Sequence, residues 1–89
     1  MQKNSNDEKA WFDKGNDLIK SGKYKEAIEC FDKIIEITKD KVGKIWYLKG
    51  LALTRLNRQE EAIECFDKAI DINPNNETAW LFKKFALDD

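Results

Sequence analysis

The sequence repeats itself at an offset of 35 residues, and this repeat restricts the possible folds more than any other feature. Residues 27–37 and 62–72 are identical at nine of eleven positions. The same offset aligns Trp11 with Trp46, and a further 34 residues aligns Trp46 with Trp80. Repeats of this length are typical of stacked units, each of which buries its apolar face against its neighbours. We therefore expect a repeat fold.

The first repeat contains two stretches of helical periodicity separated by a turn. Trp11, Gly15 and Leu18 follow the spacing of one helix face, and the Ser-Gly-Lys segment 21–23 interrupts it. An apolar stripe at helical spacing follows over residues 24–35, with charged residues between its members. This order predicts a helix, a tight turn and a second helix.

The second repeat predicts the same two helices, over about residues 42–56 and 59–71. Its second helix is expected to end at the Asn-Pro-Asn segment 73–75, because proline cannot donate the hydrogen bond that continues a helix. A fifth helix is expected to start near Glu77, with Asn76 as its N-cap, and to continue to the end of the sequence.

The two repeats resemble the tetratricopeptide repeat, whose pattern is W-x2-L-G-x2-Y followed by A-x3-F and a proline. The matching residues are Trp11, Gly15, Ala27 and Phe31 in the first repeat and Trp46, Gly50, Ala62, Phe66 and Pro74 in the second. The departures are Lys14 and Lys49 in place of Leu, Leu18 and Leu53 in place of Tyr, and Lys39 in place of Pro. The resemblance covers nearly the whole chain.

The repeats and the resemblance together predict an all-α fold, with antiparallel helix-turn-helix units stacked as a short right-handed α-solenoid of five helices. Residues 1–6 are expected to be a flexible N-terminus, and residues 7–89 a single domain. This domain comprises one repeat over 7–41, a second over 42–76, and a capping helix or truncated third repeat over 77–89.

The composition argues against several classes of function. Sixteen basic and seventeen acidic residues are interspersed along the chain and leave a net charge of −1, which argues against nucleic-acid binding. No apolar run approaches the roughly 18 residues of a membrane span, and no signal sequence is evident, so we expect a cytoplasmic protein. The sequence has no histidine and no CxxC motif. We therefore predict no metal site, no cofactor and no enzymatic activity.

The small residues of the repeats have a packing role in this interpretation. Gly15 and Gly50 are expected on the core side of their helices, where the helices that begin near Ala27 and Ala62 fold back on them. Close approach of the helix backbones would then explain why these four positions are small.

The tryptophans and cysteines are also interpreted as structural residues. Trp11, Trp46 and Trp80 are expected in the core. Cys30 and Cys65 occupy equivalent places one repeat apart, and stacked helices lie roughly 8–10 Å apart, beyond the roughly 7 Å that a disulfide spans between Cα atoms. Both are therefore predicted to be reduced thiols.

The side of each first helix that faces away from the core is the candidate binding surface. A helix packed on one side is normally polar on the other, yet the third and fifth predicted helices are apolar on both sides. In the tetratricopeptide family, the first helices line a concave groove that holds peptides or partner helices. The candidate partner-binding residues are Lys9, Phe12, Asn16, Lys20, Lys44, Tyr47, Leu48, Leu51, Arg55, Leu81, Phe82 and Phe85, with Lys9, Lys20, Lys44 and Arg55 as a basic rim.

One subtype of the family is disfavoured by the residues present. Tetratricopeptide modules that clamp the acidic tails of heat-shock chaperones use Lys and Asn on the first helix, Asn on the next repeat's first helix, and Lys and Arg on a third. Only Asn16 matches this set. The other four positions hold Phe12, Leu48, Thr78 and Phe82, which lack the required charges and amides.

Two functions remain open from the sequence. The first is a protein-interaction scaffold that binds a peptide or helix of another protein in the groove. The second is self-association, as a homodimer or within a longer array, through the same apolar surface. The fifth helix favours self-association, because Lys84 replaces the glycine of the earlier repeats, and Trp80 and Leu87 are expected to be less covered than their equivalents.

Overall fold

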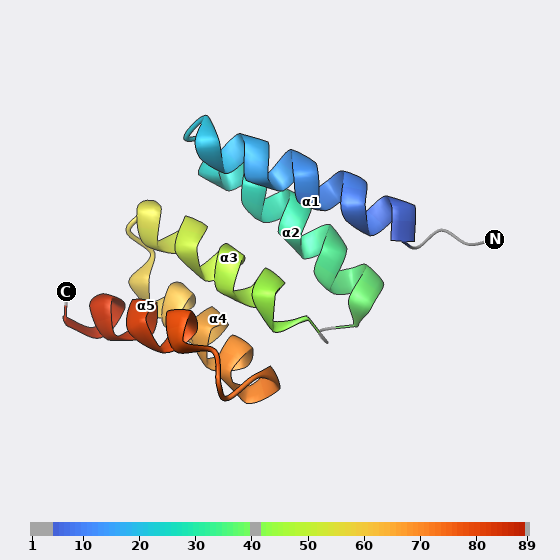
Figure 1. The fold of residues 1–89 in the computed structure, drawn as a ribbon. Helices are drawn as coiled ribbons and strands as arrows, with labels where there is room; N and C mark the ends of the chain where they lie inside the picture. Colours follow the sequence, from blue (N-terminus) through green and yellow to red (C-terminus); the bar gives the residue numbers. More distant parts are fainter. Residues whose placement is uncertain (1–4, 40–41, 89) are drawn as a thin grey trace.

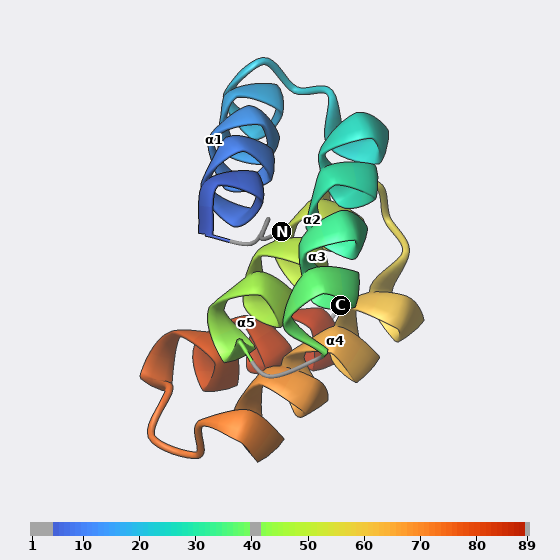
Figure 2. The same ribbon diagram turned by 90° about the vertical axis from the view of Figure 1, so that its right-hand side faces the viewer.

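The computed structural model describes residues 5–39 and 42–88, which form five α-helices and no strand. The helices are α1 (Ser5–Lys20), α2 (Tyr24–Thr38), α3 (Gly43–Arg55), α4 (Gln59–Ile72) and α5 (Glu77–Asp88). Consecutive helices pack against each other, and α3 also contacts α5. Figure 1 looks onto α1, α3 and α5, and Figure 2 shows α2 and α4 as the layer behind them. The predicted all-α stack of helix-turn-helix repeats is confirmed.

The helix boundaries differ from the predicted ones by only a few residues. Helix α1 begins at Ser5, two residues before the expected domain boundary at residue 7. The rest of the expected flexible N-terminus, residues 1–4, lies outside the described residues, as do residues 40–41 in the connection between the repeats and residue 89.

The turn inside each repeat ends its first helix in the same way. Gly22 adopts a left-handed conformation with a φ of 78°, and the Lys23 N–H donates to the Leu18 carbonyl at 2.8 Å. Asn57 adopts the same conformation in the second repeat with a φ of 63°. The Arg58 N–H then donates to the carbonyl of Leu53 at 2.9 Å, the equivalent of Leu18. This six-residue closure is a Schellman motif, and it reverses the chain so that each second helix returns along the first.

The predicted start of α5 is confirmed by its cap. The Asn76 side-chain oxygen accepts a hydrogen bond from the Ala79 N–H at 3.1 Å, which satisfies one of the free donors in the first helical turn. Upstream, α4 ends at Ile72, just before the Asn-Pro-Asn segment, and the Asn73 side chain accepts from the Asn75 N–H at 3.3 Å. The segment thus forms the expected break between α4 and α5.

The two buried phenylalanines of the second helices form the centre of the core. Phe31 and Phe66 have no exposed surface, and each ring lies against the glycine of its own repeat. A Cβ atom built on Gly15 would lie 2.7 Å from the Phe31 ring, and one on Gly50 would lie 2.6 Å from the Phe66 ring. Gly15 and Gly50 therefore lie in the core, as predicted. The groups nearest to them are these rings and not Ala27 and Ala62, which we expected from the sequence.

A second buried face of the first helices was not identified from the sequence. Ile45 on α3 packs with residues of α2, and Ala79 and Ala86 on α5 pack with residues of α4. Ala52 on α3 is also fully buried. These residues join α3 and α5 to the preceding repeat, whereas the glycine face joins α1 and α3 to the second helix of their own repeat.

The prediction that all three tryptophans are core residues is wrong for Trp80. Trp11 and Trp46 are half-buried, but half of the Trp80 surface is exposed. The reason is that this position packs against the second helix of its own repeat, and none follows α5 in the described residues. Cys30 and Cys65 are buried free thiols, as expected.

Candidate functional site

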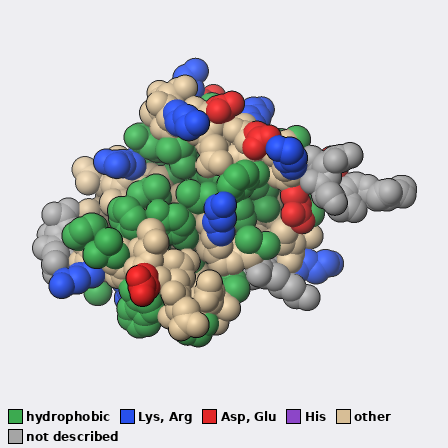
Figure 3. Space-filling model, viewed as in Figure 1, with side chains coloured by type: hydrophobic (Ala, Val, Ile, Leu, Met, Phe, Trp, Pro, Cys, Tyr) green, Lys and Arg blue, Asp and Glu red, His purple; other side chains and the backbone are tan. Residues whose placement is uncertain are grey.

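The first helices bring the predicted binding residues onto one side of the molecule. Eleven of the twelve residues predicted from the sequence, all except Leu81, form what we call the first-helix face; they come from α1, α3 and α5, which Figure 1 shows at the front. Figure 3 shows hydrophobic side chains gathered on this side, with Lys and Arg side chains mostly around them. Lys9, Lys20, Lys44, Arg55, Leu81 and Phe85 are exposed, and Phe12, Asn16, Tyr47, Leu48, Leu51 and Phe82 are half-buried.

An aromatic cluster spans the part of this face between α3 and α5. The ring centroids of Tyr47 and Phe82 are 5.7 Å apart, and Phe85 meets Phe82 edge to face at 5.9 Å. The buried Phe66 lies beneath, 6.2 Å from Phe82 and 6.3 Å from Tyr47. Burial raises the pKa of the Tyr47 hydroxyl, which keeps it protonated and able to donate. Because Phe85 is 54% exposed, the cluster ends in an open apolar surface.

A cavity lies between α1 and α3, in the part of the first-helix face away from the aromatic cluster. It has a volume of about 320 Å³ and is lined by Glu8, Lys9, Phe12, Ile34, Val42, Lys44 and Ile45. The Lys44 ammonium lies 4.9 Å from the centroid of the Phe12 ring, at the distance of a cation–π contact. The floor of this cavity is therefore apolar, and its rim carries the positive charges of Lys9 and Lys44 together with the negative charge of Glu8.

The basic residues of the first-helix face lie at its two ends, not evenly around it. Lys20 and Arg55 are in the last turns of α1 and α3, where positive charge favours the negative end of the helix dipole. Lys44 lies in the first turn of α3, and it lines the small cavity together with Lys9. The Lys9 ammonium is 3.1 Å from the Asp13 carboxylate, so part of its charge is already balanced within α1.

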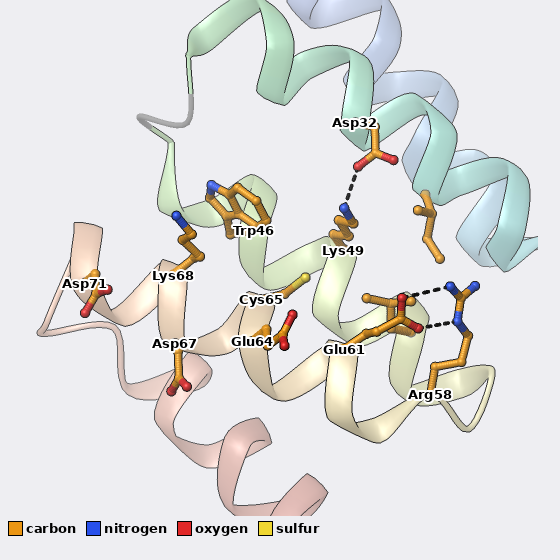
Figure 4. A pocket seen from close by; sticks show the side chains of 12 residues that line it. Asp32, Trp46, Lys49, Arg58, Glu61, Glu64, Cys65, Asp67, Lys68 and Asp71 are labelled. Atoms are coloured by element: carbon orange, nitrogen blue, oxygen red, sulfur yellow. Dashed lines mark hydrogen bonds and ion pairs between the residues drawn. The ribbon is translucent and has the colours of Figure 1, made fainter.

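A further hollow lies on the opposite side, between α2 and α4, and the sequence did not predict it. It has a volume of about 660 Å³, and Figure 4 shows the charged side chains that surround Trp46 and Cys65 there. Arg58 forms a double hydrogen bond with Glu61 at 2.6 and 3.0 Å. Lys49 is 2.7 Å from Asp32. These two pairs balance four of the charges that line the hollow, and the remaining Glu64, Asp67, Asp71 and Lys68 leave it net acidic.

Cys65 in this hollow is unsuited to act as a nucleophile. Its side chain is buried, and burial raises the pKa of the thiol to about 11 although the nearby Lys49 opposes this shift. At neutral pH the thiolate, which is the reactive form, is therefore scarce. Within residues 5–39 and 42–88 there is no cluster of His, Cys, Asp or Glu that could hold a metal ion.

Lys49, one of the departures from the tetratricopeptide pattern, and its equivalent Lys83 make the same two contacts. Lys49 bonds Asp32 of the preceding repeat at 2.7 Å, and Lys83 bonds Asp67 at 2.6 Å. Each ammonium also lies over the tryptophan of its own helix, at 5.4 Å from Trp46 and 5.5 Å from Trp80. The recurrence of these Asp, Trp and Lys residues, with Asp and Lys 17 residues apart in one set and 16 in the other, marks them in the sequence but does not pair them across helices.

Leu81 belongs to a different surface from the one predicted. It corresponds to Tyr47, which packs against Phe82 on the following first helix. Leu81 therefore points toward the place of a further first helix, and half of its surface is exposed because the described residues contain none. The predicted set thus divides into the first-helix face, which ends at Phe85, and Leu81 on a separate surface along the far side of α5.

Comparisons with known proteins agree with this architecture. None of the described helices is long and apolar enough to cross a membrane. A comparison with curated proteins found no match. Among solved structures, the fold is similar to that of the TPR2AB domain of yeast Sti1 in complex with pHSP90, with a TM-score of 0.87 and 22% sequence identity. The match covers 93% of this chain and 32% of the Sti1 chain. The tetratricopeptide repeat model matches residues 8–40 and 43–76. The chain therefore belongs to the tetratricopeptide repeat family, a class of protein-interaction repeats.

Proposed function

We propose that the first-helix face binds a peptide or helix of another protein and that the chain acts as a scaffold without catalytic activity. The observation that carries this proposal is the aromatic cluster of Tyr47, Phe82 and Phe85, which ends in an exposed ring. An open apolar surface rimmed by charge is typical of a protein-interaction site. Burial of a partner's apolar side chain against Phe85 would remove this ring from water.

The positions of the charges suggest the chemistry of the partner. Positive side chains lie at both ends of the first-helix face, with Lys44 over Phe12 at one end and Arg55 in the last turn of α3 at the other. The middle is apolar. A fitting ligand is an amphipathic segment with apolar residues at helical spacing and acidic residues flanking them. Such charges would steer binding and fix its direction more than they would strengthen it.

This proposal can be tested by selecting ligands from a displayed library of amphipathic peptides. We expect the selected peptides to share an apolar centre with acidic flanks. Phe85→Asp should weaken their binding at least ~10-fold, because an anion replaces a central aromatic contact. Leu87→Asp is the matched control, since it places the same charge at an exposed apolar position on another side of α5 and should leave binding unchanged. Selected peptides that bind Phe85→Asp as tightly as the original chain would exclude the proposed site.

A ligand of the chaperone-tail type is not expected to bind. Phe12 and Leu48 pack against the core where that subtype has a cationic or amide donor, and Phe82 packs within the aromatic cluster. Asn16 alone would offer few charge-assisted hydrogen bonds to carboxylates. In titration calorimetry, a peptide that ends in an acidic chaperone tail should bind no better than its scrambled control. Sequence-specific binding in the micromolar range would contradict this expectation.

A further inference from the structure

The far side of α5 is an apolar surface separate from the first-helix face. We call it the α5 end face, formed by Glu77, Trp80, Leu81, Lys84 and Leu87. All five residues are exposed, with half of Trp80, half of Leu81 and 61% of Leu87 accessible to solvent. The opposite side of the helix, with Ala79 and Ala86, is buried against α4. The equivalent of Leu87 in α3 is Leu53, which is only 2% exposed because α4 covers it.

The other end of the stack shows that an exposed end need not be apolar. Ile45 and Ala52, which are buried on α3, correspond to Ala10 and Asp17 on α1, and both of these are exposed. Asp13 is exposed between them. Polar outer faces of this kind keep the terminal units of repeat proteins soluble. The polar α1 end also disfavours head-to-tail stacking of copies, because the α5 end face offers a single cation, Lys84, for Asp13 and Asp17 and is otherwise apolar or acidic.

Lys84 argues against a further helix that presents phenylalanine as α2 and α4 do. It stands where Gly15 and Gly50 lie beneath the phenylalanine rings of their own repeats. Even a single Cβ at Gly50 would lie 2.6 Å from the Phe66 ring, and Lys84 carries a whole side chain at this place. A following helix with a phenylalanine in the place of Phe31 or Phe66 would therefore clash with the Lys84 side chain.

The charges of the α5 end face are complementary to themselves. At 100° per residue, Glu77 and Lys84 are two turns apart on one side of the helix, with Trp80 and Leu81 between them. In an antiparallel pair of α5 helices related by a two-fold axis near residues 80–81, Glu77 of each copy lies opposite Lys84 of the other. We propose that a second copy of this chain docks on the α5 end face in this arrangement, burying Trp80 and Leu81 at the centre.

The proposal is tested by reversing the charges and measuring the mass by sedimentation equilibrium. The original chain should be mainly monomeric at about 10 μM and mainly dimeric near 1 mM, since the interface is smaller than that of a stable dimer. Glu77→Lys and Lys84→Glu should each weaken the dimer at least ~10-fold, because each places like charges opposite one another. The double variant should restore the dimer to within ~3-fold of the original.

Matched controls separate docking from folding. Glu60→Lys reverses an exposed charge in the first turn of α4, as Glu77→Lys does in α5, and should leave the dimer unchanged. All variants should keep their helical circular dichroism signal. A chain that stays monomeric near 1 mM would overturn the proposal, and so would a double variant that remains as weak as the single ones. Peptide binding by Lys84→Glu should be unaffected, so failure of this proposal is distinguishable from failure of the first-helix face.

Discussion

Phe66→Ala is expected to lower the free energy of unfolding by about 3–5 kcal/mol. The Phe66 ring has no exposed surface, lies against Gly50, and contacts Tyr47 and Phe82 across two other helices. Removing it leaves a cavity where α3, α4 and α5 meet. A chain of this length has a total stability of roughly 5–10 kcal/mol, so the variant should be close to unfolding at room temperature.

Urea denaturation followed by circular dichroism measures this loss. Phe85→Ala provides the matched control. It also removes a phenylalanine ring from the aromatic cluster, but at a position that is 54% exposed. It should cost less than about 1 kcal/mol. Equal losses in the two variants would show that Phe66 is not at the centre of the core.

Gly50→Ala is expected to destabilise the original chain and to stabilise a Phe66→Leu variant. In the original, the added methyl group would lie 2.6 Å from the Phe66 ring, and such overpacking costs about 1–3 kcal/mol. Replacing glycine by alanine within a helix otherwise contributes about 1 kcal/mol of stability. Without the ring, only this gain should remain, so the sign of the effect should reverse.

A double-mutant cycle from the same urea experiments isolates this contact. The free-energy change for Gly50→Ala is compared with and without the Phe66 ring. A coupling of at least ~1 kcal/mol is expected from the two opposing contributions. If Gly50→Ala has the same effect in both backgrounds, the close approach of ring and glycine does not explain the small residue at this position.

The helices and their order could be predicted from the sequence because each depends on local chemistry. The apolar spacing defines the helices, Gly22 ends the first one, and Asn76 caps the last. The 35-residue repeat then implies that these units stack. The second buried face of α3 and α5 could not be predicted from the apolar spacing. Its equivalent residues Ile45 and Ala79 differ in size, so they do not recur as a visible motif of the repeat.

The candidate site was predicted only in part, because periodicity along one helix does not show how neighbouring helices cover its side chains. Phe12, Tyr47 and Phe82 lie on the predicted side, but they also pack against buried residues, so exposure is concentrated at Phe85. Leu81 was assigned to the same face because helical periodicity places it near Phe85. Only the contact between Tyr47 and α5 shows that this position faces the next helix in the stack.

The ion pairs between repeats illustrate a further limit of sequence patterns. Lys49 and Lys83 lie on first helices, and their partners Asp32 and Asp67 lie on the preceding second helices. Helical periodicity orders residues around one helix but does not determine which residues of two helices meet. The same ammonium groups lie 5.4 Å from the Trp46 ring and 5.5 Å from the Trp80 ring, contacts that the spacing along one helix does not reveal either.

Binding at the first-helix face is tested by mapping where a selected peptide contacts the protein. The ¹⁵N-labelled Lys84→Glu variant, which is expected to be monomeric, would be titrated with the peptide and followed by amide chemical shifts. We expect the shifts to concentrate around Phe12, Tyr47 and Phe85, while the amides near Cys65 remain unchanged. Shifts concentrated around the hollow between α2 and α4 would contradict it.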